Sequence, residues 1–272
     1  VSGDRPREAL RMMLSQEAAA VGTDAATNKA KALLESSYEL CFNHACAFID
    51  EGRLADAETW LQKAKELCVG ELMQAEELEE EAAGVLEDHE ELAAIQVQRG
   101  CVLQRRGAID EAGEIYNRVL KQRSGQSREV DITVLAVACN NVVALRSEGK
   151  SLFDSLKRIN VASKESLEHK LTRKQTIEIA INKCLLMIQA HKMDDARREL
   201  NRLREGFPGH PRVAVVQAAI ALAEKKPRVC EEVLEAYLAE HPGNEEVLLI
   251  LAQLHVQQHR LERAVEALSQ LS

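Results

Sequence analysis

Small and apolar residues recur along this chain at a fixed interval, and inside each interval they have helical spacing. Ala196, Cys230 and Ala264 follow one another at steps of 34 residues, and Pro208 and Pro242 are separated by the same step. Within each interval apolar residues lie three or four positions apart, which is the spacing of one side of an α-helix. A repeat of this length predicts a helix–turn–helix unit stacked along a line, and therefore an all-α chain.

The unit between Tyr38 and Cys68 shows this pattern most clearly. Ala45 takes the small position at which the first helix meets the second, and Gly52 takes the turn, where glycine adopts positive φ without steric cost. The inward side of the second helix then carries Ala57, Leu61 and Ala64. Because small residues are needed where two helices cross closely, the pattern predicts which side of each helix is buried.

The same landmarks predict that residues 1–272 form a single domain of stacked units, each of which contacts only its neighbours. The units are expected at 38–71, 93–126, 177–210, 211–244 and, truncated, 245–272, after an incomplete unit at 1–34. A degenerate repeat with a basic loop is expected at 135–174, where Asp154 takes the small position of the second helix. The glutamate-rich insertion at 72–92 is either a solvated extension or an acidic contact for a basic partner segment. The last unit carries the landmarks Ala264, Leu268 and Leu271 and ends with apolar residues and no polar capping helix, so more chain is expected to follow it.

The order of small residue, large residue, glycine, small residue and proline resembles the tetratricopeptide repeat. This resemblance implies a superhelix of antiparallel helix pairs, in which the first helix of each pair lines a concave, peptide-binding face. Residues just before the small landmark of each first helix are expected to point into that face, because residues three and four apart share one side of a helix.

Primary amides stand two residues before that landmark in four units, at Asn43, Gln98, Asn140 and Asn182. An amide both donates and accepts hydrogen bonds, so amides repeated once per unit can pair with the backbone of an extended peptide. The alternative is that they cap or bridge adjacent helices. Apolar pockets beside the amides are expected at Phe42, Cys46, Ile49, Val97, Cys101, Cys139, Val143, Ile181 and Leu185. In the last two units the amide position holds Val216 and Ile250, which predicts a more apolar contact or a seat for another helix.

Composition narrows the class of partner. The chain has 44 acidic and 35 basic residues and a formal net charge of -9. This charge argues against nucleic acid as the main partner, because phosphate binding depends on clustered Lys and Arg. The seven cysteines are scattered and form no CxxC pair, which fits a reducing, cytoplasmic setting. The longest apolar run, Val213–Ala223, is far shorter than the roughly 20 residues that span a bilayer.

No catalytic residue, cofactor or metal site is predicted. His255 and His259 stand four residues apart, a spacing that zinc sites use, but the HExxH pattern is absent. The repeat instead places His255 in the core and His259 in a turn. No nucleophile, base and oxyanion set can be assembled from the sequence, and it contains no glycine-rich phosphate loop.

Three strings are more specific than the repeat landmarks. They are YELCFNHACAFIDEGRLADAETWLQKAKELC at 38–68, LAVACNNVVALRSEGKSLFDSLKRI at 135–159 and NKCLL at 182–186. From about Tyr38 to its end the chain closely resembles the tetratricopeptide region of the family of 72-kDa subunits of the signal recognition particle.

This resemblance implies a non-catalytic scaffold that holds an extended C-terminal segment of the 68-kDa subunit in a cytoplasmic ribonucleoprotein, which targets nascent proteins to the endoplasmic reticulum. Particle RNA would be contacted only indirectly or through a basic segment after the repeats, and neither membrane insertion nor a small-molecule substrate is expected. The alternative is a cytoplasmic co-chaperone or adaptor that clamps a peptide terminus. Such a clamp needs Lys or Arg on the concave face, where the first unit presents Glu39 and Asp50.

Overall fold

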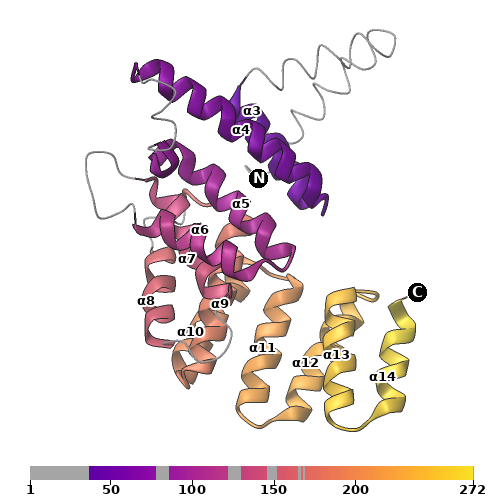
Figure 1. Cartoon of the computed structure of the whole chain (residues 1–272). Coiled ribbons are helices and arrows are strands. Elements are labelled where there is room, and N and C mark those ends of the chain that lie inside the picture. The colour runs from indigo at the N-terminus through magenta and orange to yellow at the C-terminus, as the bar shows by residue number, and fades with distance from the viewer. Residues whose placement is uncertain are drawn as a thin grey trace, which may run out of the picture. The chain divides into compact units, whose positions relative to one another are not determined.

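The computed structural model describes residues 37–77, 86–121, 130–145, 152–164, 167 and 169–271. Their regular structure consists of α-helices and short 3-10 helices, and none of the described residues lies in a strand (Figure 1). The all-α prediction is therefore confirmed. The incomplete unit predicted at 1–34 and residues 78–85 of the acidic insertion lie outside the described residues.

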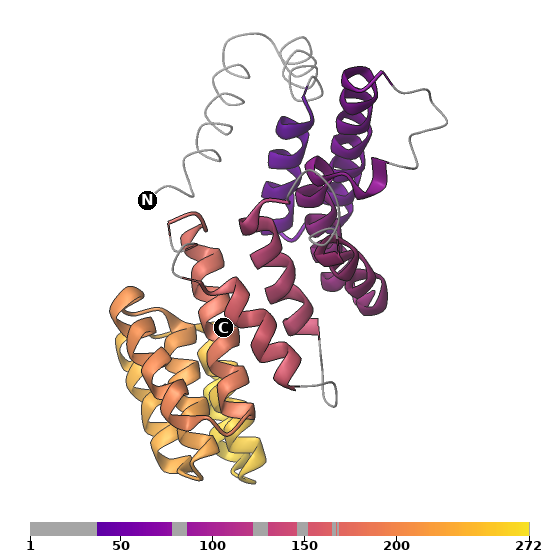
Figure 2. The ribbon, with the colours of Figure 1, turned by 90° about the vertical axis from the view of Figure 1, so that its left-hand side faces the viewer.

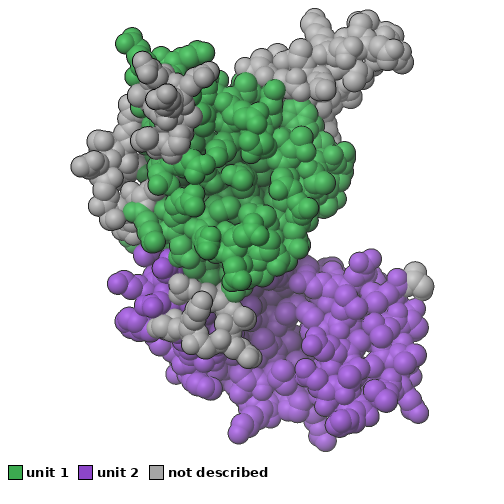
Figure 3. All heavy atoms as spheres, in the orientation of Figure 1, with its two compact units in different colours: residues 1–148, 164–173 green, residues 149–163, 174–272 purple. Residues whose placement is uncertain are grey.

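The chain divides into two compact units, which Figure 3 shows in different colours. Unit 1 comprises residues 1–148 and 164–173, and unit 2 comprises residues 149–163 and 174–272. Each unit has hydrophobic core clusters of its own. One continuous solenoid domain over 1–272 stays a prediction.

Unit 1 contains the first two helix pairs and the first helix of the third repeat. Its elements are α3 (Tyr38–Asp50), α4 (Leu54–Ala75), η2 (Glu90–Leu92), α5 (Ala93–Arg105), α6 (Ile109–Lys121) and α7 (Ile132–Leu145). Within each pair the helices pack together, α3 on α4 and α5 on α6, and each first helix also contacts the next, α3 with α5 and α5 with α7 (Figures 1 and 2). The predicted small landmarks of these first helices, Ala45, Gly100 and Val142, are buried.

Unit 2 contains the second helix of the third repeat and three further pairs. Its elements are α8 (Leu152–Ala162), all but the first residue of α9 (Arg173–Gln189), α10 (Met193–Gly206), α11 (Pro211–Ala223), α12 (Pro227–Glu240), α13 (Glu245–Gln257), α14 (Leu261–Leu268) and η5 (Ser269–Leu271). The predicted landmarks of the last three pairs are buried at Cys184, Ala196, Ala218, Cys230, Ala252 and Ala264. Pro208 and Pro242 follow the ends of α10 and α12, as expected for a residue that cannot continue a helix.

The third repeat differs from the prediction in register by one residue. Helix α8 buries Ser155, Ile159 and Ala162, whereas Asp154 is exposed. These three residues have the spacing of the inward side of the other second helices, so Ser155 takes the small position that was predicted for Asp154. The reason is electrostatic, because a carboxylate at a helix crossing would be buried without a partner and a hydroxyl close to alanine in size is tolerated there.

The landmark residues of the last helix differ in burial. Ala264 is buried, but Leu268 is 43% exposed. Leu234, which holds the equivalent position in α12, is fully buried in a core cluster that includes Val247 and Leu251 of the next helix. No described α-helix follows α14, so the burial of this position depends on the neighbouring repeat and not on its own pair.

Five described turns inside the helix pairs have a residue in the left-handed backbone conformation. Gly52 and Gly107 have φ values of 76° and 87°. The equivalent turn residues of the last three pairs are His191, Lys225 and His259, with φ values of 57°, 61° and 59°. A side chain with a Cβ is strained in this region by about 1–2 kcal/mol, so these three turns carry a cost that the first two avoid.

Lys225→Gly is expected to raise the free energy of unfolding by about 1 kcal/mol, because glycine removes the strain at this φ and the gain exceeds the added entropy of the unfolded chain. Urea unfolding followed by circular dichroism measures the change. Lys226→Gly is the matched control, since Lys226 has a φ of -113° and glycine relieves nothing there. Equal effects of the two substitutions would contradict the strain at Lys225.

Candidate functional site: the helix-A face

The first helices of successive repeats lie next to one another in each unit, and we call the side that they form the helix-A face. In unit 1 it consists of α3, α5 and α7, and in unit 2 of α9, α11 and α13. The predicted peptide-binding residues all lie on these helices. Those brought together in unit 1 are Phe42, Asn43, Cys46, Ile49, Gln98, Cys101, Asn140 and Val143, whereas Asn182 and Leu185 belong to unit 2.

The four predicted amides differ in their exposure to solvent. Asn43 is exposed, Gln98 and Asn182 are half-buried, and Asn140 is buried with 8% of its surface exposed. Asn140 Nδ2 donates to Asn141 Oδ1 at 3.3 Å. In unit 1 the amides that an incoming backbone can reach are therefore those of Asn43 and Gln98. The amide ladder stays a prediction.

The predicted apolar positions divide in the same way. Half-buried positions are Phe42, Cys46, Cys101 and Leu185. Buried positions are Ile49, Val97, Cys139, Val143 and Ile181. Since the buried residues pack inside the repeats, the first group is the one that can offer apolar surface to a partner.

Neighbouring repeats in unit 1 are joined by polar contacts that the periodicity does not reveal. Arg105 Nη1 donates to the Ile49 carbonyl oxygen at 2.6 Å, at the C-terminal end of α3, where carbonyl groups lack helical partners. Glu87, near the end of the acidic insertion, pairs with Lys65 of α4 at 2.9 Å and with Arg118 of α6 at 3.4 Å. The hydrogen bond from Lys65 lowers the pKa of Glu87. This part of the insertion therefore connects two second helices.

A row of alternating charges crosses the helix-A face of unit 2. Glu178, Arg212 and Glu246 lie 34 residues apart on α9, α11 and α13. Arg212 forms an ion pair with Glu178, and its Nε lies 3.6 Å from Glu246 Oε1. These side chains are partly exposed, so each pair contributes at most about 1 kcal/mol, and the row mainly fixes the register of the repeats. Applying the repeat interval to charged residues, as well as to small ones, would have found it.

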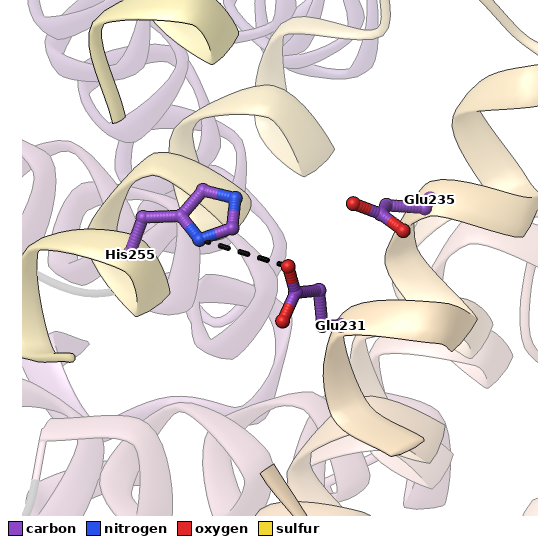
Figure 4. Close-up of side chains that lie close together, drawn as sticks. All are labelled: Glu231, Glu235 and His255. Atoms are coloured by element: carbon purple, nitrogen blue, oxygen red, sulfur yellow. Dashed lines mark ion pairs between the residues drawn. The ribbon is translucent and has the colours of Figure 1, made fainter. Parts of the chain in front are cut away.

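Three possible metal ligands also come together in unit 2. Glu231, Glu235 and His255 present ligand atoms within 4.8 Å of one another, and Figure 4 shows His255 and Glu231 facing each other with Glu235 nearby. His255 Nδ1 is buried and lies 4.0 Å from Glu231 Oε1. Sequence reasoning missed this group, because it compared His255 with His259 and not with the i, i+4 glutamates of α12.

The Glu231 carboxylate already has cationic partners. Arg260 donates to both of its oxygens, at 2.9 and 2.5 Å, and Arg263 Nη1 donates to Oε1 at 2.9 Å. The hydrogen bond from Arg260 lowers the pKa of Glu231, and burial lowers the pKa of His255. Two guanidinium groups balance the two carboxylates, so a divalent cation would add uncompensated positive charge. We interpret the group as a salt-bridge network that joins α12 to α13 and α14.

Burial keeps the core thiols protonated. It raises the pKa of Cys68 and of Cys184 to about 12, and it raises the pKa of Cys230 as well. A protonated thiol is a weak nucleophile and a poor metal ligand, so these residues serve as small core side chains.

Comparison with known protein families identifies the class of protein to which this chain belongs. Two family models of the tetratricopeptide repeat match the chain, one over residues 38–68 and the other over residues 221–272. Together with the paired, periodic helices of both units, these matches define the chain as a tetratricopeptide-repeat protein.

Its sequence is homologous to the signal recognition particle subunit SRP72. The chain is 34% identical over 234 residues to SRP72 of Canis lupus familiaris and of Homo sapiens, which is 85% of this chain and 33% of each of those proteins. It is 33% identical over 222 residues to SRP72 of Schistosoma mansoni, which is 80% of this chain and 30% of that protein. The chain thus spans about a third of the length of these curated relatives.

Solved structures share the fold at low sequence identity. A tetratricopeptide repeat protein from Parabacteroides merdae aligns with a TM-score of 0.52 and 18% identity over 86% of this chain and 78% of that chain. PilF of Pseudomonas aeruginosa aligns with a TM-score of 0.52 and 17% identity over 86% of this chain and 90% of that chain. Among the described residues, no helix combines the length and the apolar character needed to cross a bilayer.

Proposed function

We propose that this chain acts as a non-catalytic interaction scaffold of the signal recognition particle and holds an extended segment of the 68-kDa subunit. In this role it supports co-translational targeting of proteins to the endoplasmic reticulum and works in the cytoplasm. The observation that carries the proposal is the homology to SRP72 across 85% of the chain. The chain spans about a third of the length of that protein. The proposal therefore concerns only the partner segment that this region holds, and not every contact of the whole subunit.

The helix-A face of unit 1 has the chemistry that such a segment needs. Asn43 is exposed on α3 and Gln98 is half-buried on α5, and these two helices contact each other. Phe42, Cys46 and Cys101 lie on the same helices as half-buried apolar side chains. An extended chain leaves its backbone groups unpaired, so amides that donate and accept can hold it without reading its side chains. The apolar neighbours would then set the preference for particular side chains.

The negative charge of this chain disfavours two other kinds of partner, a terminal peptide carboxylate and RNA. Glu39 and Asp50 are exposed on α3, so a peptide carboxylate would meet like charge there. The net charge of -9 disfavours direct contact with particle RNA for the same electrostatic reason. A basic or neutral polypeptide segment suits this surface better.

Replacing Asn43 and Gln98 together by alanine is expected to weaken binding of the C-terminal segment of the 68-kDa subunit about tenfold. The change removes two groups whose hydrogen bonds contribute about 0.5–1.5 kcal/mol each. Isothermal titration calorimetry of the whole chain with a synthetic peptide of that segment measures the affinity. Asn201→Ala, an exposed amide on the second helix α10, is the control and should leave it unchanged.

The two parts of the proposal fail in different ways. If the unaltered chain binds no C-terminal segment of the 68-kDa subunit, the partner is wrong. If the segment binds and the double variant binds equally well, the partner stands and the amides of α3 and α5 are not the contact.

A further inference from the structure

A histidine occupies a core position in the last helix pair. His255 lies on α13 and is 2% exposed, and no other histidine among the described residues of unit 2 is buried. The equivalent positions one and two repeats earlier hold Ala221 and Met187, so the stacking of first helices does not require an imidazole at this place. His255 differs from these residues in that it can take up a proton near neutral pH.

The Nδ1 atom of His255 is buried and has no hydrogen-bond partner. It lies 4.0 Å from Glu231 Oε1, and Figure 4 shows the imidazole facing that carboxylate. The same oxygen already accepts hydrogen bonds from Arg260 and Arg263. A neutral imidazole with its proton on Nε2 presents only a lone pair at Nδ1, whereas a protonated one would bury a charged donor without an acceptor.

The charged groups around His255 come from α12, from α14 and from the turn between α13 and α14. Glu231 and Glu235 lie on α12. Arg260 directly precedes α14, and Arg263 lies on it. Burial lowers the pKa of His255, the two carboxylates act in the opposite direction, and the two arginines lower the pKa further. The imidazole is therefore neutral at neutral pH.

These side chains also attach α14 to the rest of unit 2. The Arg260 guanidinium donates to both oxygens of Glu231 on α12, and the Arg260 backbone N–H donates to the His255 carbonyl oxygen at 2.9 Å. Arg263 donates to Glu231 from α14 itself. Because one carboxylate lies between the arginines and the imidazole, a positive charge on His255 would compete with the arginines for it.

We propose that His255 is an acid-sensitive switch in the last helix pair. With a neutral imidazole, Glu231 binds Arg260 and Arg263 and holds α14 against α12 and α13. Proton uptake by His255 places a third cation next to Glu231 inside the core, and this charge weakens the attachment of α14. The repeats loosen at this pair when the pH falls below neutrality.

The pH range of the switch follows from the direction of the pKa shift. The unfolded chain takes up the proton at the ordinary histidine pKa of about 6.5, whereas the folded chain takes it up at lower pH. The contribution of His255 to stability is therefore complete well above pH 6.5 and falls as the pH falls below that value. The hydrogen bond from Arg260 lowers the pKa of Glu231, so protonation of this carboxylate acts in a more acidic range.

Amide hydrogen exchange of the whole chain, followed by NMR at about pH 7.5 and about pH 5.5, tests the switch. After correction for the intrinsic effect of pH on exchange, protection of the amides of α13 and α14 is expected to fall about threefold or more at the lower pH. His255→Gln and His255→Leu should abolish this fall, because neither side chain takes up a proton. His259→Gln, at an exposed position in the turn before α14, is the matched control and should retain it.

Two substitutions of exposed neighbours should shift the pKa of His255 in opposite directions. Arg263→Gln removes a cation beside the imidazole and should raise the pKa, whereas Glu235→Gln removes an anion and should lower it. NMR titration of His255 measures both shifts. Because every readout is a change with pH, a loss of stability common to both pH values does not affect it. The proposal is overturned if the pKa of His255 is not below its ordinary value, if the protection of α14 does not fall, or if the His255 variants retain the fall.

Discussion

Gly100→Ala is expected to lower the free energy of unfolding by about 1–3 kcal/mol, although alanine is the better helix former. A Cβ at Gly100 would lie 2.5 Å from Tyr116 Cε1 and 2.9 Å from its Cζ, closer than real Cβ contacts. The Tyr116 ring cannot move aside, because it is fully buried and its hydroxyl donates to Gln104 Oε1 at 3.0 Å. Position 100 must therefore be glycine, because the Tyr116 ring occupies the space that a Cβ would fill.

A double-mutant cycle separates this clash from other effects of the substitution. Tyr116→Leu removes the ring atoms that the new Cβ would meet, so Gly100→Ala should cost little or nothing in that background. Gly70→Ala, also inside a helix, is the control. Apart from its chain neighbours and the adjacent backbone of its own helix, no heavy atom lies within 4 Å of the Cβ added at Gly70, and the substitution should stabilise the chain by about 0.5–1 kcal/mol. If Gly100→Ala costs the same in the Tyr116→Leu background as in the unaltered chain, the crossing does not explain the glycine.

The same crossing explains why the fold could be predicted from the sequence. Where the two helices of a pair approach closely, only a small residue fits, so the buried residues Ala196, Cys230 and Ala264 mark the repeat at a constant interval of 34 residues. The correction in the third repeat arises where this rule is less informative, because Ser155 is small but polar and lies next to Asp154. Leu268 is 43% exposed, whereas the equivalent Leu234 is buried against α13, so burial of this position depends on the neighbouring repeat.

The candidate site was harder to predict than the fold. Asn43, Gln98 and Asn140 all stand two residues before a landmark and lie on first helices, but their exposure ranges from exposed for Asn43 to 8% for Asn140. Exposure depends on how closely neighbouring first helices approach, and the interval between repeats does not encode that distance. The contact from Arg105 to the Ile49 carbonyl has the same origin, since it arises between repeats and not within one.

Ala57→Glu is expected to have the largest effect of any substitution considered, with a loss of more than about 4 kcal/mol of unfolding free energy. Ala57 is fully buried in a core cluster with Cys41, Leu61 and Ile95, so it joins α4 to both α3 and α5. Glutamate there overpacks the crossing, which costs about 1–3 kcal/mol, and it buries a carboxylate at further cost.

The measurement is thermal unfolding by circular dichroism, with NMR signals of the two units recorded separately. Because repeats are stabilised by their neighbours, the first two pairs should lose their structure while the signals of α12 and α13 persist. Ala55→Glu, an exposed position on the same helix, is the control and should change stability by less than about 0.5 kcal/mol. If Ala57→Glu melts like the unaltered chain, then the small residues do not mark helix crossings, and the stacking of repeats that forms the helix-A face loses its physical basis.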